Sequence, residues 1–110
     1  MTMGKWSTYR KRGSAGRGPT LGPPPAPTLR VTDGVVFQDA TGLDDTGGQV
    51  RLEQSADGID EWETWGNQPW DNPTEWGEVD EWSGNFVRAF EIGNGTVYAG
   101  DSAPSNTLEL

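Results

Sequence analysis

The side chains in this sequence that can do acid–base or metal chemistry are almost all carboxylates. The 110 residues contain seventeen aspartates and glutamates, no histidine and no cysteine. The lack of histidine removes the commonest general base, and the lack of cysteine removes thiolate chemistry and disulfides. Two acids can hydrolyse a glycosidic bond only when both are placed in a cleft. A chain this small has no room to shape a cleft beside its core, so we expect no enzyme and no catalytic residues.

Calcium is the remaining metal chemistry, because it prefers hard oxygen ligands. Four aspartates lie in predicted loops where carboxylates can converge: Asp44, Asp45, Asp57 and Asp60. Their spacing is not that of an EF-hand, and an Asp-Gly turn accounts for Asp57 without a metal. We therefore predict no metal site and no cofactor, with calcium at these loops as a minor alternative.

Tryptophan is the other residue type that the chain concentrates. Five of its six tryptophans fall within 21 residues, at a spacing that fits neither one helix face nor one strand. We expect Trp62 or Trp65 in the core, because a small domain needs large side chains to fill it. Trp70 and Trp76 stand among prolines and asparagines. We expect these two at the surface, either buried against a neighbouring subunit or stacked on sugar rings.

Charge divides the chain into two parts. Residues 1–30 carry six cations and no acid, whereas residues 31–110 hold all seventeen acids against only Arg51 and Arg88. The two parts therefore have charges of +6 and −15, which make up the net charge of −9. A basic arm joined to an acidic body is an organisation that points to an interaction through the arm.

We predict that residues 1–28 form an extended basic arm. Glycines interrupt it throughout, and five prolines between Pro19 and Pro27 favour a polyproline spacer. The arm is a solubilising tail, a nucleic-acid contact that the acidic body disfavours, or, in the reading we prefer, an anchor that orders on another protein. Aromatic anchors and cations that pair with carboxylates then make the contact. These predicted partner-binding residues are Lys5, Trp6, Tyr9, Arg10, Lys11, Arg12 and Arg17.

Residues 29–110 read as an acidic body of short strands. The turn dipeptide Asp33-Gly34 predicts a first hairpin, and strands are predicted at 49–54, 59–65, 85–92, 96–99 and 106–110. Both faces of 85–92 are apolar, so both need cover. No segment has helical periodicity, which predicts an all-β fold, a small antiparallel sandwich. The predicted core residues are Val50, Leu52, Trp62, Val87 and Ala89.

Two segments resemble fibronectin type III and related immunoglobulin-like domains. GQVRLEQSADGIDEWETWGN is similar to the central hairpin of that family, and NFVRAFEIGNGTVYAGDSAPSNTLEL is similar to its last two strands. The resemblance runs from Pro27 to Leu110. It departs from the family at Asn85, where a tyrosine is usual, and in the Trp-rich residues 66–84. It implies an immunoglobulin or fibronectin-III-like β-sandwich.

The resemblance also implies a role, because phages commonly use such small domains as virion proteins. A basic Gly/Pro-rich arm resembles those that fasten decoration or connector proteins to a capsid or tail. The implied function is a non-enzymatic capsid decoration or cement protein on the virion surface, assembled in the host cytoplasm. The alternatives are a neck, tail or baseplate component, and a carbohydrate-binding adhesion module that uses Trp70 and Trp76.

The expected partners follow from these roles. They are other virion proteins, namely major capsid or tail and neck subunits, or further copies of this chain in a homo-oligomer. A glycan is the partner in the adhesion alternative, whereas nucleic acid is disfavoured. No apolar run approaches the roughly 18 residues of a membrane span, and no apolar signal-peptide core follows Met1, so no membrane partner is expected.

Overall fold

A computed structural model describes residues 21–110, and the structural statements below concern these residues. They form an all-β fold, as the sequence predicted. The elements in chain order are β1 (Thr28–Thr32), β2 (Val35–Asp39), β3 (Gln49–Ser55), β4 (Glu63–Pro69), β5 (Thr74–Glu78), the 3-10 helix η1 (Val79–Trp82), β6 (Phe86–Ile92) and β7 (Leu108–Glu109). This part of the chain contains no helix of the length and apolarity that crossing a membrane requires.

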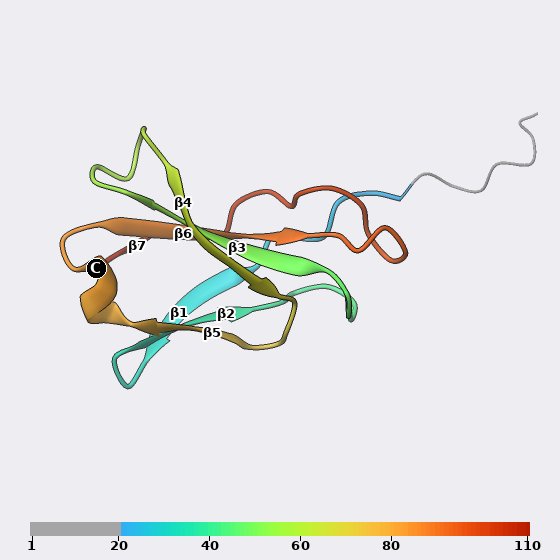
Figure 1. The fold of residues 1–110 in the computed structure, drawn as a ribbon, viewed down its shortest axis with the longest axis horizontal. Coiled ribbons are helices and arrows are strands. Elements are labelled where there is room, and N and C mark those ends of the chain that lie inside the picture. Colours follow the sequence, from blue (N-terminus) through green and yellow to red (C-terminus); the bar gives the residue numbers. More distant parts are fainter. Residues whose placement is uncertain (1–20) are drawn as a thin grey trace, which may run out of the picture.

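The strands form two antiparallel sheets that pack against each other (Figure 1). One sheet has the strand order β1-β2-β5 and the other has the order β4-β3-β6-β7. Consecutive strands β4 and β5 are therefore edge strands of different sheets. We call the side of the sandwich on which they lie the open side, because the outer backbone groups of both edges lack a neighbouring strand there.

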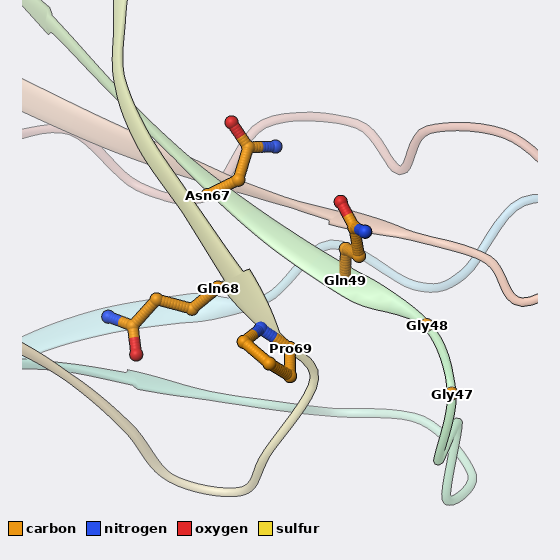
Figure 2. A pocket seen from close by; sticks show the side chains of 6 residues that line it. All are labelled: Gly47, Gly48, Gln49, Asn67, Gln68 and Pro69. Carbon is orange, nitrogen blue, oxygen red and sulfur yellow. The ribbon is translucent and has the colours of Figure 1, made fainter.

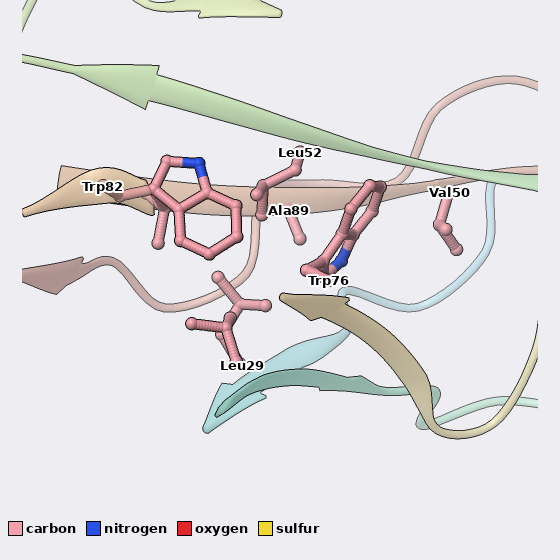
Figure 3. Packing of buried hydrophobic residues seen from close by; sticks show 8 residues of the cluster. Leu29, Val50, Leu52, Trp76, Trp82 and Ala89 are labelled. Atoms are coloured by element: carbon pink, nitrogen blue, oxygen red, sulfur yellow. The ribbon is translucent and has the colours of Figure 1, made fainter. Parts of the chain in front are cut away.

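The core lies between the two sheets, and alternate residues of the central strands fill it. Val50 and Leu52 of β3 and Val87 and Ala89 of β6 are at most 1% exposed. All four were predicted as core from the alternation of apolar residues. They pack with Leu29, Val36, Trp76 and Trp82, most of which Figure 3 labels.

Trp62 was also predicted as core, and the structure places it elsewhere. Its ring lies over the Arg88 guanidinium, 4.1 Å from the guanidinium carbon to the ring centroid. Arg88 alternates with buried residues of β6, so it points out of the sandwich. The prediction failed because β4 begins at Glu63 rather than at Ile59, which leaves Trp62 in the preceding turn.

Two tryptophans stand at β-bulges in the edge strands, and Trp76 is turned into the core whereas Trp65 stays partly exposed. In β4, Trp65 is the residue that the pairing with β3 skips, and in β5, Trp76 is the residue that the pairing with β2 skips. An extra residue in one strand re-aims its side chain. The two rings meet edge to face across the open side, with centroids 6.2 Å apart. Each is followed by a glycine, Gly66 or Gly77, and Gly77 has a φ of 145° that favours glycine.

Trp82 completes this aromatic cluster from η1. Its side chain is fully buried, and its ring centroid lies 4.9 Å from that of Trp65. The sequence analysis did not single out Trp82. Trp65 itself is 37% exposed, so it contacts the two inner rings on one side and solvent on the other, and it is not part of the buried core.

The two inner tryptophans should respond differently to replacement by phenylalanine. The Trp76 indole N–H donates to Gln38 Oε1 at 2.9 Å inside the core, so Trp76→Phe leaves that oxygen without a donor. The Trp82 indole N–H is buried without a partner, so Trp82→Phe removes an unsatisfied group. We expect Trp76→Phe to cost at least about 1 kcal/mol more in the free energy of unfolding, measured by urea denaturation. Equal losses would contradict this hydrogen bond.

The segment before β1 belongs to the body. Gly22 O accepts a hydrogen bond from Ala99 N at 3.0 Å, and Ala26 O accepts one from Thr41 Oγ1 at 2.7 Å. Pro24 and Pro27 are buried, and Figure 1 shows the blue segment beside the red loop that follows β6. The last residues of the predicted 1–28 arm, from Gly22 on, are thus held against the sandwich.

The long connection from β6 to β7 differs from the prediction as well. Residues 96–99, predicted as a strand, form a turn in which Gly95 N donates to Tyr98 O at 2.8 Å. The last predicted strand is confirmed only as the short β7. Between these two segments the backbone follows β6, where Ser102 N donates to Glu91 O and Ser105 N donates to Ala89 O, both at 2.8 Å.

Candidate binding groove on the open side

Two hollows lie at the end of β4, on either side of a ridge formed by Gln68 and Pro69. The first, which we call the amide pocket, has a volume of about 300 Å³ and is lined by Gly47, Gly48, Gln49, Asn67, Gln68 and Pro69. Figure 2 shows the Gln49 and Asn67 amides pointing the same way, whereas the Gln68 amide points to the other side of β4. Gln68 lines both hollows, and its side-chain amide points toward the second.

The second hollow, which we call the aromatic groove, has a volume of about 540 Å³. Its lining combines rings with carboxylates and is made by Phe37, Gln68, Pro69, Trp70, Asp71, Pro73, Thr74 and Glu75. The Gln68 side-chain amide donates to Glu75 O at 2.9 Å and so links the two edge strands at the groove. Asp71 and Glu75 are exposed to solvent. The surface suits an apolar or aromatic ligand that also carries positive charge.

The strands of the open side belong to an acidic stretch of the sequence. The stretch from Leu52 to Val87 contains ten acids and no lysine or arginine, and it includes β4, β5 and η1. Neither Asp71 nor Glu75 forms an ion pair with an arginine of residues 21–110. The groove therefore offers carboxylates that its own body does not neutralise.

The arginines of residues 21–110 are all held by the body itself. Arg30 pairs with Asp39 at 2.6 Å, and Arg51 and Arg88 both pair with Glu53, at 3.3 Å and 2.9 Å. The other cations of the chain are Lys5, Arg10, Lys11, Arg12 and Arg17. Positive charge that can bind a partner is therefore expected from residues 1–20.

The outer apolar face of β6 is covered by arginine side chains of the same sheet. Arg51 lies 4.6 Å from the Phe90 ring centroid, and Arg88 lies between the rings of Trp62 and Phe90, at 4.1 Å and 5.2 Å. Guanidinium groups cover aromatic faces well, since cation–π attraction adds to the packing. This explains how β6 can be apolar on both faces without a partner on the outer one.

The predicted surface patch of Trp70 and Trp76 does not form. Trp76 is only 5% exposed because the bulge in β5 turns it into the core, so its prediction as a binding residue was wrong. Trp70 is half-buried against the core and lines the aromatic groove. The carbohydrate-binding alternative thereby loses one of its two platforms. The other aromatic residue of the groove lining is Phe37 of β2, which the sequence analysis did not single out.

The predicted arm residues lie outside the residues that the structure describes. These are Lys5, Trp6, Tyr9, Arg10, Lys11, Arg12 and Arg17. Their role in binding a partner stays a prediction.

Two acids, Asp45 and Glu91, lie in the interior behind the amide pocket. They are 0% and 1% exposed, and a side chain on Gly48, which lines that pocket, would collide with Asp45 Oδ2. Asp45 Oδ1 accepts a hydrogen bond from Asn94 N at 3.3 Å, while Asp45 Oδ2 and both Glu91 carboxylate oxygens have no partner. Both carboxyl groups are closed to solvent, so they do not form a catalytic pair that a substrate can reach.

Burial raises the pKa of the Glu91 carboxyl group above its ordinary value, and the charge of Asp45 raises it further. The Trp70 indole N–H opposes this shift, although its geometry falls short of a formed hydrogen bond. Glu91 is therefore an unpaired acid in the core, where its charged form is costly.

Two of the loop aspartates considered for calcium, Asp44 and Asp57, accept hydrogen bonds that stabilise their own turns. Asp44 accepts hydrogen bonds from the side chain and backbone N–H of Thr46, and Asp57 accepts from the backbone N–H of Ile59 and Asp60. These bonds lower the pKa of both carboxyl groups. In the part of the chain that the structure describes, no three metal-ligating side chains converge.

No family model, no curated protein and no solved structure matches this chain.

Proposed function

We propose that this protein is a non-enzymatic structural component of a virion, held in its assembly by the basic residues near its N-terminus. The observation that supports this proposal is the separation of charge between the two parts of the chain. Residues 21–110 carry seventeen acids against three arginines that their own body engages, and residues 1–20 carry five cations and no acid. A segment with that composition binds a carboxylate-bearing surface.

The way in which residues 21–27 are held supports the same role. Because this segment is bonded to the body, residues 1–20 start from a fixed point on the sandwich. In Figure 1 the blue segment and the C-terminus lie toward opposite ends of the molecule. A copy bound through its N-terminal residues then presents its C-terminal end away from the contact.

Many copies bound side by side on a lattice can stabilise an assembly even when each contact is weak. Each copy adds a modest binding free energy, and many copies together stabilise the assembly by mass action and multivalency. A capsid decoration or cement protein is the role we propose first, and a neck, tail or baseplate component is the alternative. The resemblance to fibronectin-type domains used in phage particles supports both roles equally.

Neutralising the basic cluster should remove the protein from particles. The triple variant Arg10→Gln, Lys11→Gln, Arg12→Gln is expected to lower the number of copies per purified particle by about tenfold, because it removes three charge-assisted contacts. Quantitative mass spectrometry of particles gives the copy number. The charge-conserving variant Arg10→Lys, Lys11→Arg, Arg12→Lys serves as the control and should be incorporated almost normally. Full incorporation of the neutral variant would overturn the proposal.

A further inference from the structure

We propose that the aromatic groove binds the basic N-terminal segment, residues 5–17, of a second copy of this chain. Copies would then join head to tail through one segment and one groove. This inference rests on the proposed function and deepens it, because it identifies the neighbouring subunit that receives the segment.

Charge complementarity is the first argument. The groove opens on the stretch from Leu52 to Val87, which has ten acids and no cation, and the segment has five cations and no acid. Asp71 and Glu75 stand exposed at the groove without an ion pair in the described body. An attraction between opposite charges of this density steers the two surfaces together and excludes acidic competitors.

The groove lining supplies the second argument. Its rings come from Phe37, Trp70 and two prolines. Arg30 of the same body already lies over the Phe37 ring, 4.7 Å from its centroid, so Trp70 and the prolines are the rings that suit a segment of aromatic and cationic side chains. Trp6 and Tyr9 of the segment stand beside its cluster of three cations at residues 10–12. An aromatic side chain of the segment would then pack in the groove while its guanidinium groups pair with the groove carboxylates.

The unpaired sheet edges supply the third argument. The groove lies between β4 and β5, which are the edge strands of two different sheets. An extended segment placed here can bond to outward-facing backbone groups of either strand, in the manner of β-strand addition. The Gln68 amide already occupies one such group, the carbonyl oxygen of Glu75.

The direction of the chain favours a second copy over the same molecule. Residues 21–27 are fastened to the loops around Thr41 and Ala99. In Figure 1 this blue segment leads away from the turn between β4 and β5. Because each copy has one segment and one groove, contacts between copies are heterologous, and they produce rings or open chains.

Self-association of the purified full chain tests the inference. Sedimentation at about 50 mM salt should show concentration-dependent association that about 500 mM salt abolishes, since screening weakens exposed charge pairs. Glu75→Lys should weaken association at least about tenfold. Glu109→Lys is the matched control, because it makes the same change at an exposed position of a strand, β7, far from the groove, and it should associate like the natural chain. A chain that stays monomeric at low salt would overturn the inference.

Mixing a variant that lacks the groove charge with one that lacks the segment charge tests whether the segment of one copy binds the groove of another. The Glu75→Lys chain keeps its segment, and the chain with Arg10→Glu, Lys11→Glu and Arg12→Glu keeps its groove. Each alone should be monomeric, and the mixture should form a one-to-one complex. A mixture that remains monomeric would show that the segment does not bind the groove of another copy. If Glu75→Lys loses self-association but is incorporated into particles normally, another subunit receives the segment there, which overturns the inference for the particle and leaves the proposed function standing.

Discussion

Trp82→Ala is expected to lower the free energy of unfolding by about 3–5 kcal/mol, which is a large share of the roughly 5–15 kcal/mol that such domains possess. Trp82 is fully buried and contacts the ring of Trp65, so its removal leaves a cavity between the sheets. The residue comes from the four-residue η1, whose short backbone is held between β5 and β6 and can collapse only partly into that cavity. Urea denaturation followed by circular dichroism measures the loss.

Trp65→Ala is the control for this prediction. It removes the same side chain from the same aromatic cluster, but from a position that is 37% exposed. Less apolar area returns to water and water can fill the space, so we expect about half the loss of Trp82→Ala. If both variants lost the same stability, the cluster would not be organised around Trp82.

Local patterns were sufficient to predict most strands of this fold. The Asp33-Gly34 turn and the apolar residues around it fixed the first hairpin, because hairpin register depends on neighbouring residues only. Alternation placed Val50, Leu52, Val87 and Ala89 on inner faces. Such predictions hold wherever a strand keeps its two-residue period from end to end.

The strands of the Trp-rich region were not predicted correctly, because two edge strands interrupt the two-residue period. A bulge at Trp65 and another at Trp76 change which face the following residues occupy, and no single alternation describes either strand. A signal was nevertheless present in the sequence. The tetrapeptides ETWG (63–66) and TEWG (74–77) place a glycine directly after each bulged tryptophan, and glycine in a strand often marks a bulge.

The groove could not be predicted from the sequence, whereas one of the buried acids could. The groove joins Phe37 to residues of β4 and β5, and its composition depends on sheet register, which the sequence did not reveal. Glu91, in contrast, follows Val87 and Ala89 at two-residue spacing, so alternation already placed it on the inner face of β6. A carboxylate at such a position is a reason to look for a buried partner.

Glu91→Gln is expected to stabilise the body at neutral pH by roughly 1–3 kcal/mol, the usual cost of a buried polar group without a partner. Both carboxylate oxygens of Glu91 lack donors, and Asp45 adds a second acid nearby. A glutamine side chain fills the same space without charge, so the cost of burying a charged group beside a second acid is removed. Thermal or urea unfolding at pH 7 measures the gain.

Glu53→Gln is the matched control and should change stability in the opposite direction. Glu53 accepts hydrogen bonds from the Arg88 side chain at 2.9 Å and also pairs with Arg51, so neutralising it leaves Arg88 without its carboxylate, whereas Arg51 keeps Asp101 at 3.1 Å. The comparison separates the loss of a charge in general from the loss of an unpaired charge. Stabilisation by both variants would point to the net charge of −9 as the cause instead.

The pH dependence gives the sharper test of Glu91. Because its pKa is raised in the folded protein above the ordinary value of 4.5, the folded state binds more protons than the unfolded chain as the pH rises from 4.5 through the folded value. The contribution of Glu91 to stability is therefore fully present below 4.5 and is lost across that window. Asp44 and Asp57, whose pKa values are lowered, contribute with the opposite sign, but they do so equally in both proteins. The advantage of Glu91→Gln over the natural chain should thus be largest at neutral pH and shrink as the pH falls toward 4. An advantage that did not depend on pH would assign the gain to side-chain packing, whereas one that vanishes in acid assigns it to the unpaired charge.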